Sequence, residues 1–362
     1  MVNIFKKLLP RKFLGIDIGT SSIKLVEVSK MAGRKKLENY GQLSISYTDS
    51  RSFRTFEKST LVLSNEEVAK AINIIFKEAK ISTKKVIFSV PDFSSFFTSF
   101  KLPPMTKEEL PQAVKYEARQ HIPVPLEEVV LDWQIMESRV IDKKKNLFKI
   151  LLAAVPNEVI HQYEQIAKLS KLELFALEAE IFSLIRALVP KHEKGPVAVI
   201  DIGAQSTTCS IVDKGDLKTS HSFDMSDNDL TAALASSLNI DFARALKMKK
   251  EAGLQNGIKE NGQNIKDVLS PLIDMIMREI NEIINNFYRN EKIKVEKIIL
   301  AGGTALMPGL KEYFQEWFKE QEITIGNPFF SINYPPLLEQ ALNEMGPRYA
   351  IAVGAALRGL QD

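Results

Sequence analysis

The stretch FLGIDIGTSSIKLVEV, residues 13–28, decides the fold of this chain. It holds two apolar segments, residues 13–17 and 23–28, on either side of a short turn. Apolar runs that flank a glycine and small hydroxyl residues predict two strands joined by a tight connection. A third run, residues 37–46, follows and completes a predicted antiparallel meander.

The same pattern returns as VAVIDIGAQSTTCSIV, residues 197–212. Its Asp201 follows Asp17 by 184 residues (201 − 17), and each aspartate begins an Asp-Ile-Gly turn after an apolar run. A pattern that recurs at this distance indicates a duplicated chain. The length of 362 residues allows two lobes or one large lobe with subdomains, and the repeat favours two lobes.

Composition is that of an ordinary globular protein. The apolar fraction is 45%, the charged fraction is 26% and the net charge is +3, which is too balanced to argue for a nucleic-acid partner. No run approaches the roughly 18 apolar residues of a membrane span. The single cysteine, Cys209, excludes an intramolecular disulfide, and no signal-peptide core follows Met1. We therefore expect a cytoplasmic protein.

Residues 1–12 form a basic N-terminal segment. Ile4, Phe5 and Leu8 interleave with lysine and arginine, as in a short interfacial helix. One or two helical turns bury too little apolar area to hold a membrane, so we favour a solvated tail and only indirect membrane association.

Helix and strand patterns then alternate, which predicts an α/β fold. Ser64 and Glu67 form a capping-box signature ahead of an apolar stripe that ends near Ala79, and residues 85–90 read as a buried strand. Residues 92–156 predict a small α+β unit; its strands are residues 96–102, 129–138 and 148–155, its turn is at 142–145, and its helix follows a capping box of Thr106 and Glu109.

The last third of the chain predicts further elements of both kinds. Ser270 and Pro271 mark a helix start, and the apolar stripe that follows is expected to be core. Residues 253–264 read as a solvated loop, residues 297–300 as a strand and residues 351–360 as a C-terminal helix.

The two Asp-Ile-Gly turns are the candidate phosphate-binding elements, because glycine lets backbone N–H groups approach phosphate oxygens. One such turn alone is usually a plain strand-end turn, but the matched pair favours nucleotide binding. Asp17 and Asp201, one from each half, are placed to hold a hydrated Mg²⁺ across a cleft. The other candidate phosphate contacts are Gly19, Thr20, Ser21, Ser22, Lys24, Gly203, Ala204 and Gln205.

A third element, IILAGGTA at residues 298–305, predicts a strand that runs into a double-glycine turn. The turn of Gly302, Gly303 and Thr304 can admit a flat adenine against bare backbone, or it can simply be a tight strand-to-helix connection. Two phosphate turns followed by this turn, in this order, resemble the superfamily of actin, sugar kinases and heat-shock chaperone ATPases.

One segment resembles the PilM family of type IV pilus assembly proteins. It comprises KLPPMTKEEL (101–110), VKYEA (114–118) and HIPVPLEEV (121–129), with AVGAALR (352–358) near the end of the chain. The resemblance implies a duplicated, ribonuclease H-like actin fold that binds ATP and Mg²⁺. Its first lobe would be residues 13–91 and 157–190, its second lobe residues 191–362, and its inserted α+β subdomain, of the FtsA type, residues 92–156.

The same resemblance implies a partner and a place in the cell. The partner is the N-terminal cytoplasmic tail of a PilN-like membrane protein, which would dock between the inserted unit and the first lobe. The chain would then sit with other pilus platform proteins at the inner face of the cytoplasmic membrane. A filament-forming ATPase like FtsA or MreB, which would form homo-oligomers, is the alternative, and a metabolic kinase fits least well.

Two departures from the family pattern predict weakened ATP binding. The family usually carries a Gly-Gly pair before the helix that follows the second turn, but residues 225–231 contain no glycine. Leu246 stands where the family places a glutamate that contacts the nucleotide sugar; losing that contact costs about 1 to 2 kcal/mol. Lys249, in the same helix, remains a predicted nucleotide contact.

Hydrolysis needs a group that orients water toward the γ-phosphate. Glu180 is the candidate, with Glu178 almost as suitable and a solvated helix residue as the plain alternative. We therefore expect ATP binding with slow or absent hydrolysis.

Overall fold

The computed structural model describes residues 10–44, 64–92, 95–136 and 147–361. It contains two five-stranded sheets of the same design. The first has the order β3-β2-β1-β4-β8 and consists of β1 (Arg11–Ile18), β2 (Ser22–Met31), β3 (Arg34–Ser44), β4 (Lys85–Val90) and β8 (Glu173–Ala179). The second has the order β11-β10-β9-β14-β15 and consists of β9 (Val197–Ile202), β10 (Thr207–Asp213), β11 (Asp216–Phe223), β14 (Lys297–Ala301) and β15 (Glu322–Ile325).

In both sheets a three-strand antiparallel meander continues into two parallel strands. The predicted duplication and the α/β two-lobe fold class are confirmed. The tail prediction needs a correction, because Arg11 and Lys12 pair with Lys30 and Ser29 of β2 and so belong to the first strand. Residues 1–9 lie outside the described part of the chain.

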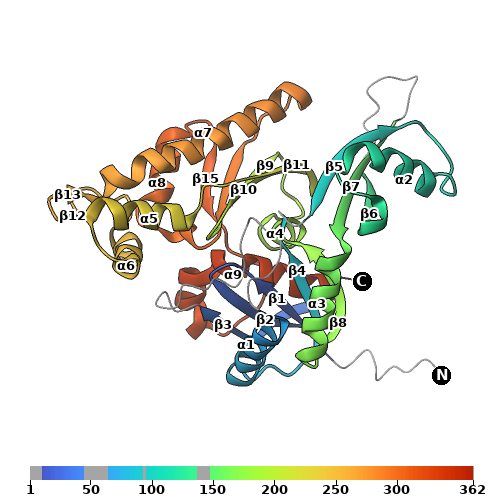
Figure 1. The fold of residues 1–362 in the computed structure, drawn as a ribbon, viewed down its shortest axis with the longest axis horizontal. Helices are drawn as coiled ribbons and strands as arrows, with labels where there is room; N and C mark the ends of the chain where they lie inside the picture. The colour runs from blue at the N-terminus through green and yellow to red at the C-terminus, as the bar shows by residue number, and fades with distance from the viewer. Residues whose placement is uncertain (1–9, 45–63, 93–94, 137–146, 362) are drawn as a thin grey trace.

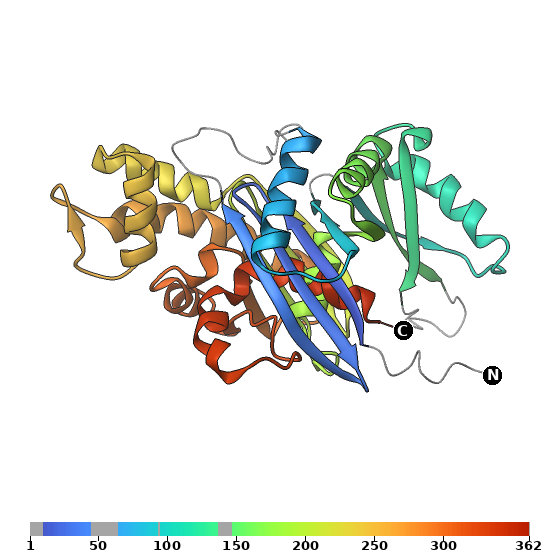
Figure 2. The ribbon, with the colours of Figure 1, turned by 90° about the horizontal axis from the view of Figure 1, so that it is seen from below.

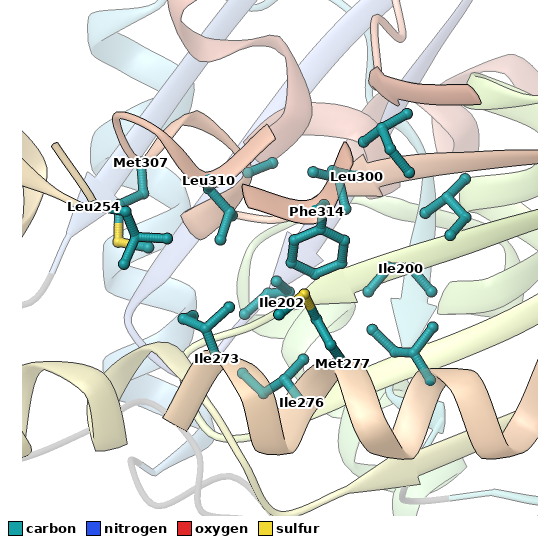
Figure 3. Packing of buried hydrophobic residues seen from close by; sticks show 14 of the residues in the cluster. Ile200, Ile202, Leu254, Ile273, Ile276, Met277, Leu300, Met307, Leu310 and Phe314 are labelled. Carbon is teal, nitrogen blue, oxygen red and sulfur yellow. The ribbon is translucent and has the colours of Figure 1, made fainter. Parts of the chain in front are cut away.

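Helices cover the outer face of each sheet. In the first lobe these are α1 (Asn65–Glu78) and α3 (Asn157–Leu169), and the predicted capping box of Ser64 and Glu67 is present. In the second lobe they are α5 (Asp227–Leu238), α6 (Phe242–Ala252), α7 (Ile265–Glu291) and α8 (Leu310–Trp317). Figure 3 shows Ile273, Ile276 and Met277 of α7 turned toward the side chains of the sheet and α8, so this stripe is core, as predicted.

Two helices, α4 (Glu180–Leu188) and α9 (Glu339–Gly359), lie between the lobes, and one apolar cluster joins them to both sheets. Figure 2 shows α9, in red, running across the blue strands of the first sheet. The two helices cross so closely that a Cβ atom on Gly354 would lie 1.9 Å from the carbonyl oxygen of Ser183. Only glycine allows this approach.

Both helices that contain an internal proline begin earlier than the sequence predicted. Helix α7 begins at Ile265 with Asn264 as its N-cap, so the predicted start at Ser270 and Pro271 is wrong. Helix α9 begins at residue 339 and passes through Pro347, so the predicted start at residue 351 is also wrong. A proline removes one helical hydrogen bond, but each helix buries apolar side chains before its proline, and their burial offsets that loss.

The predicted loop of residues 253–264 is only partly solvated. Leu254 is buried, and β12 (Lys259–Glu260) pairs with β13 (Gln263–Asn264) in a small hairpin.

A third, smaller unit stands apart at the upper right of Figure 1. It is a three-stranded sheet of order β5-β7-β6 with one helix and an apolar core of its own. Its elements are β5 (Phe96–Leu102), α2 (Leu110–His121), β6 (Val129–Met136) and β7 (Phe148–Pro156). The capping bonds between Thr106 and Glu109 form, although α2 begins at Leu110. The turn predicted at residues 142–145 lies outside the described residues.

None of the described helices is long and apolar enough to cross a membrane.

Candidate functional site

A pocket of about 300 Å³ lies where the two lobes meet, between the two Asp-Ile-Gly turns and the double-glycine turn. All but one of the site residues that the sequence nominated line it, the exception being Glu178. Those that line it are Asp17, Gly19, Thr20, Ser21, Ser22, Lys24, Glu180, Asp201, Gly203, Ala204, Gln205, Lys249, Gly302, Gly303 and Thr304. Residues from both halves of the chain and from the crossing helices therefore converge on one cavity.

The two Asp-Ile-Gly turns have matching backbone geometry. The Gly19 N–H donates to the Ser22 carbonyl at 3.1 Å, and the Gly203 N–H donates to the Ser206 carbonyl at 2.9 Å. Because each glycine N–H closes its own turn, a bound phosphate would meet the N–H groups of the residues between, such as Thr20 and Ala204.

The first carboxylate of the pocket, Asp17, is 2% exposed, and only one of its oxygens is paired. Its Oδ2 accepts a hydrogen bond from Lys24 Nζ at 2.9 Å, whereas its buried Oδ1 has no partner among the described residues. Burying a carboxylate oxygen without a partner costs free energy. A bound divalent cation would remove this cost, because carboxylate oxygens are its preferred ligands.

The second carboxylate of the pocket, Asp201, is in an environment that disfavours its charged form. The pKa of Asp201 is raised to about 6, mainly by desolvation and then by the charge of Asp17, while the charge of Lys24 acts against both. A divalent cation between the two carboxylates would relieve this repulsion. Since the described residues contain no cluster of three or more metal-ligating side chains, such a cation would take its remaining ligands from water and phosphate.

A third pocket carboxylate, Asp92, was not nominated from the sequence. It follows β4, and its Oδ1 accepts a hydrogen bond from the Ile181 N–H at the start of α4, at 3.2 Å. The pKa of Asp92 is raised to about 7, mainly by burial; the hydrogen bond from the Ile181 N–H opposes this rise, and the charge of Asp201 contributes to it. A single aspartate after a strand carries no distinctive sequence signal, so only the fold brings it to the site.

The double-glycine turn forms a wall of bare backbone. Gly302 has φ of +82°, and a Cβ atom there would lie 2.4 Å from Asp201 Oδ1. At Gly303 a Cβ atom would meet nothing within 4 Å, so this residue borders open space. Leu246 and Met307 also line the pocket, and such a mixture of backbone and apolar side chains suits a flat aromatic ring.

Lys249 lines the pocket but is held by the protein. It is 2% exposed, and its ammonium group donates to Asp227 Oδ1 at 2.7 Å, to the Asp227 carbonyl at 2.8 Å and to Thr231 Oγ1 at 2.6 Å. Burial lowers the pKa of Lys249, and Asp227 acts against that shift. Because an ammonium group has three N–H donors, direct contact with a ligand requires the exchange of one of these partners.

The glycine-free segment before α5 is docked on the second turn. The Asp227 N–H donates to the Gly203 carbonyl at 2.9 Å, and the Asn228 N–H donates to the Ala204 carbonyl at 3.2 Å. The position where the sequence lacked a glycine pair thus holds an aspartate that lines the pocket.

The two glutamates considered for hydrolysis differ in their position relative to the pocket. Glu180 is the first residue of α4 and lines the pocket. Glu178 does not line it; its carboxylate accepts hydrogen bonds from Arg186 at 2.5 and 2.6 Å and from Ser183 at 2.8 Å. This ion pair removes Glu178 from consideration.

Two cations that the sequence did not nominate, Lys250 and Arg348, complete the pocket wall on the side of α6 and α9. Burial lowers the pKa of Lys250, as does the charge of Arg348, while Asp227 opposes both. The two groups are therefore close enough to repel each other.

Comparison with known proteins gives consistent matches. Residues 15–360 match the family described as type IV pilus assembly protein PilM. The cell division protein FtsA of Enterococcus faecalis is 20% identical over 345 residues, which are 85% of this chain and 77% of that protein.

Solved structures share the fold. The "PilM-PilN type IV pilus biogenesis complex" matches with a TM-score of 0.82 and 23% identity, over 96% of this chain and 98% of that one. MreB5 of Spiroplasma citri bound to ADP matches with a TM-score of 0.52 and 14% identity, over 96% of this chain and 95% of that one. These matches confirm the actin-like two-lobe fold.

Proposed function

The chain belongs to the PilM family of type IV pilus assembly proteins, and from this premise we propose that it is an ATP-binding scaffold of the pilus inner-membrane platform. The observation that carries the proposal is the single pocket lined by both Asp-Ile-Gly turns and by the double-glycine turn. A ligand held there touches both halves of the chain, so binding energy can favour one arrangement of the lobes.

Within this proposal each wall of the pocket has a task. The turns at Gly19 and Gly203 hold the phosphates, and Asp17 and Asp201 hold Mg²⁺, which neutralises phosphate charge when it is bound. Gly302 and Gly303 face the base. The unpartnered Asp17 Oδ1 supports the cation, and the ADP bound to the MreB5 relative supports a nucleotide in this fold.

Glu180 is the proposed water-orienting residue. It lines the pocket from the first turn of α4, whereas the carboxylate of Glu178 is held by Arg186. In this proposal the chain binds ATP and turns it over slowly or not at all.

The proposed partner is the N-terminal cytoplasmic tail of a PilN-like membrane protein. The shared fold with the PilM-PilN complex supports it, as does an exposed apolar position on the small unit. Val130 of β6 is 50% exposed and pairs in register with Val155, which itself packs against the core of the first lobe. The tail would lie between the residue 92–156 unit and the residue 13–91 lobe, which keeps the protein at the inner face of the membrane.

A route for nucleotide to influence this partner site is visible in the contacts of the small unit. Met136 and Leu151 pack with Ile181 of α4 and with Leu217 of the second sheet. Lys149 of β7 also pairs with Glu291 at the end of α7, at 3.2 Å. A change in lobe closure would therefore move the unit that receives the tail.

Calorimetric titration with ATP and MgCl₂ tests the nucleotide site. Wild-type protein should bind, and Asp17→Ala should lose at least about 100-fold in affinity, because it removes a metal ligand. Asp132→Ala, a matched change on the exposed strand β6, should bind like wild type. Equal affinities for Asp17→Ala and wild type would show that the cation site is elsewhere.

A synthetic peptide of the PilN-like tail tests the partner site. Val130→Asp should weaken peptide binding about tenfold or more, since it puts a charge on the proposed apolar contact. Tyr116→Ser, which alters an exposed side chain on α2, is the control and should leave affinity unchanged. Undiminished binding by Val130→Asp would remove this face from the proposal.

The similarity to FtsA and the fold shared with MreB5 support a second candidate function, which is the formation of a nucleotide-dependent filament. Sedimentation with ATP and Mg²⁺ separates the two functions, because a filament pellets only with nucleotide and a scaffold stays in the supernatant.

A further inference from the structure

Asp227 connects the two turns that would hold the ends of a nucleotide. Its backbone N–H donates to the carbonyl of Gly203 in the second Asp-Ile-Gly turn, at 2.9 Å. Its Oδ1 accepts a hydrogen bond from Thr304 Oγ1 in the double-glycine turn, at 2.5 Å. Asp227 and Thr304 are 77 residues apart in the chain. Asp227 itself lines the pocket.

One oxygen of the Asp227 carboxylate is committed to hydrogen bonds within the protein. Oδ1 receives both Thr304 and the buried ammonium group of Lys249, whose other two donors go to the Asp227 carbonyl and to Thr231. No hydrogen bond or ion pair from the described residues reaches Oδ2, and the side chain keeps 20% of its surface exposed. An ionised carboxylate accepts hydrogen bonds at both oxygens, so Oδ2 is available to a ligand donor.

The position of this oxygen matches the middle of the ligand. If phosphates lie over Gly203 and a base over Gly303, the sugar lies between them, beside the residue that bonds to both turns. We propose that Asp227 is the sugar-recognising residue of the pocket, accepting hydrogen bonds from the vicinal hydroxyls of a ribonucleotide. This inference rests on the proposed nucleotide-binding function and assigns it a specificity: ribonucleotides over deoxyribonucleotides.

The competing hypothesis is that the Asp227 carboxylate repels the phosphates of a nucleotide. Its negative charge stands beside a turn proposed to hold phosphate, where it would lower the affinity for every nucleotide alike. The two roles predict opposite results when the charge is removed. Hydroxyl recognition predicts lost discrimination between sugars, whereas repulsion predicts tighter binding of all sugars.

The test measures the affinities of the full chain for ATP, 2′-deoxy-ATP and 3′-deoxy-ATP with Mg²⁺. Wild type should prefer ATP by about tenfold, the effect of one charge-assisted hydrogen bond. Asp227→Asn should reduce this preference to less than about threefold, because an amide can still accept at Oδ1 but presents N–H donors in place of Oδ2. Asp229→Asn, two residues further along the same helix and outside the pocket lining, should keep the preference.

Each other result has a definite meaning. Equal affinity of wild type for the three nucleotides overturns the sugar assignment while the ATP site stands, and this result does not depend on whether any variant folds. Tighter binding of all three by Asp227→Asn overturns it in favour of repulsion. Wild type that binds none of the three overturns the proposed nucleotide site itself, and the sugar assignment with it.

Discussion

The two Asp-Ile-Gly turns share a backbone but differ in the side chains around them. In the first sheet Asp17 pairs in register with Lys24, and in the second sheet Asp201 pairs in register with Thr208. Lys24 gives Asp17 an ion pair at 2.9 Å, whereas Thr208 shares a hydrogen bond with Ser222. The two copies thus share the geometry of the turn, but only the first copy has a lysine paired with its aspartate.

The difference explains the uneven electrostatics of the pocket. Asp201 lies beside the charge of Asp17 and has no lysine at the matching position, so its charged form is the less favourable. The second copy instead contributes Asp227, which docks on the turn through its backbone. One half supplies a balanced ion pair, and the other supplies a carboxylate that needs a counter-charge.

Removing the lysine of the first copy should have the largest effect on stability. Lys24→Met should lower the free energy of unfolding by about 3 kcal/mol at pH 8, because it leaves the buried Asp17 without its partner. Urea titration measures this loss, and added Mg²⁺ should restore part of it. Lys36→Met breaks the more exposed Lys36–Glu38 pair and should cost less than about 1 kcal/mol. Equal losses would show that burial of the Lys24–Asp17 pair does not make it more important for stability than the exposed pair.

Substitutions in the double-glycine turn should have an intermediate effect and should separate folding from binding. Gly302→Ala should cost about 2 kcal/mol of unfolding free energy, because it combines a positive φ with a contact against Asp201. Gly303→Ala meets no neighbour and should leave stability within about 0.5 kcal/mol, yet it should weaken ATP binding by narrowing the base-facing wall. Melting curves and titrations of both variants check this; similar stability for the two would contradict the clash at Gly302.

A third expected effect is a pH dependence of the stability of the protein without ligand. The pKa values of Asp201 and Asp92 are raised from an ordinary 3.8 to about 6 and about 7, so between pH 4 and 7 the folded chain binds protons that the unfolded chain has released. The free energy of unfolding should therefore rise as the pH is lowered from 8 to 5.

Urea titrations across this pH range provide the measurement. Asp201→Asn should flatten the profile, because it removes one of the two protonation steps, and saturating Mg²⁺ should raise stability most at the alkaline end. A stability that falls steadily from pH 8 to 5 would contradict the raised pKa values.

Much of the fold and most of the pocket followed from local sequence patterns. The repeat of Asp-Ile-Gly after an apolar run predicted two matching sheets, and its glycines and hydroxyl residues predicted which turns line the pocket. Patterns of this kind are short and local, so they can be recognised in the sequence without knowing how the rest of the chain folds.

The residues that were missed depend on contacts between distant segments. Asp227 was noted only as a place without glycine, and its link to Thr304 spans 77 residues. Asp92 carries no signal until β4 and α4 bring it beside Asp201. The early starts of α7 and α9 have the same origin, because burial of side chains before Pro271 and Pro347 outweighs the local cost of proline.

The crossing of α4 and α9 at Gly354 leaves no side chain between the backbones of the two helices that separate the lobes. One apolar cluster joins these two helices to both sheets, so a displacement of either helix would be transmitted to the lobes. A methyl group placed there would act as a wedge, forcing the helices apart and widening the mouth of the pocket from a site that no ligand touches. Because Leu184 of α4 and Ile351 of α9 line the pocket, separating the two helices would move its wall.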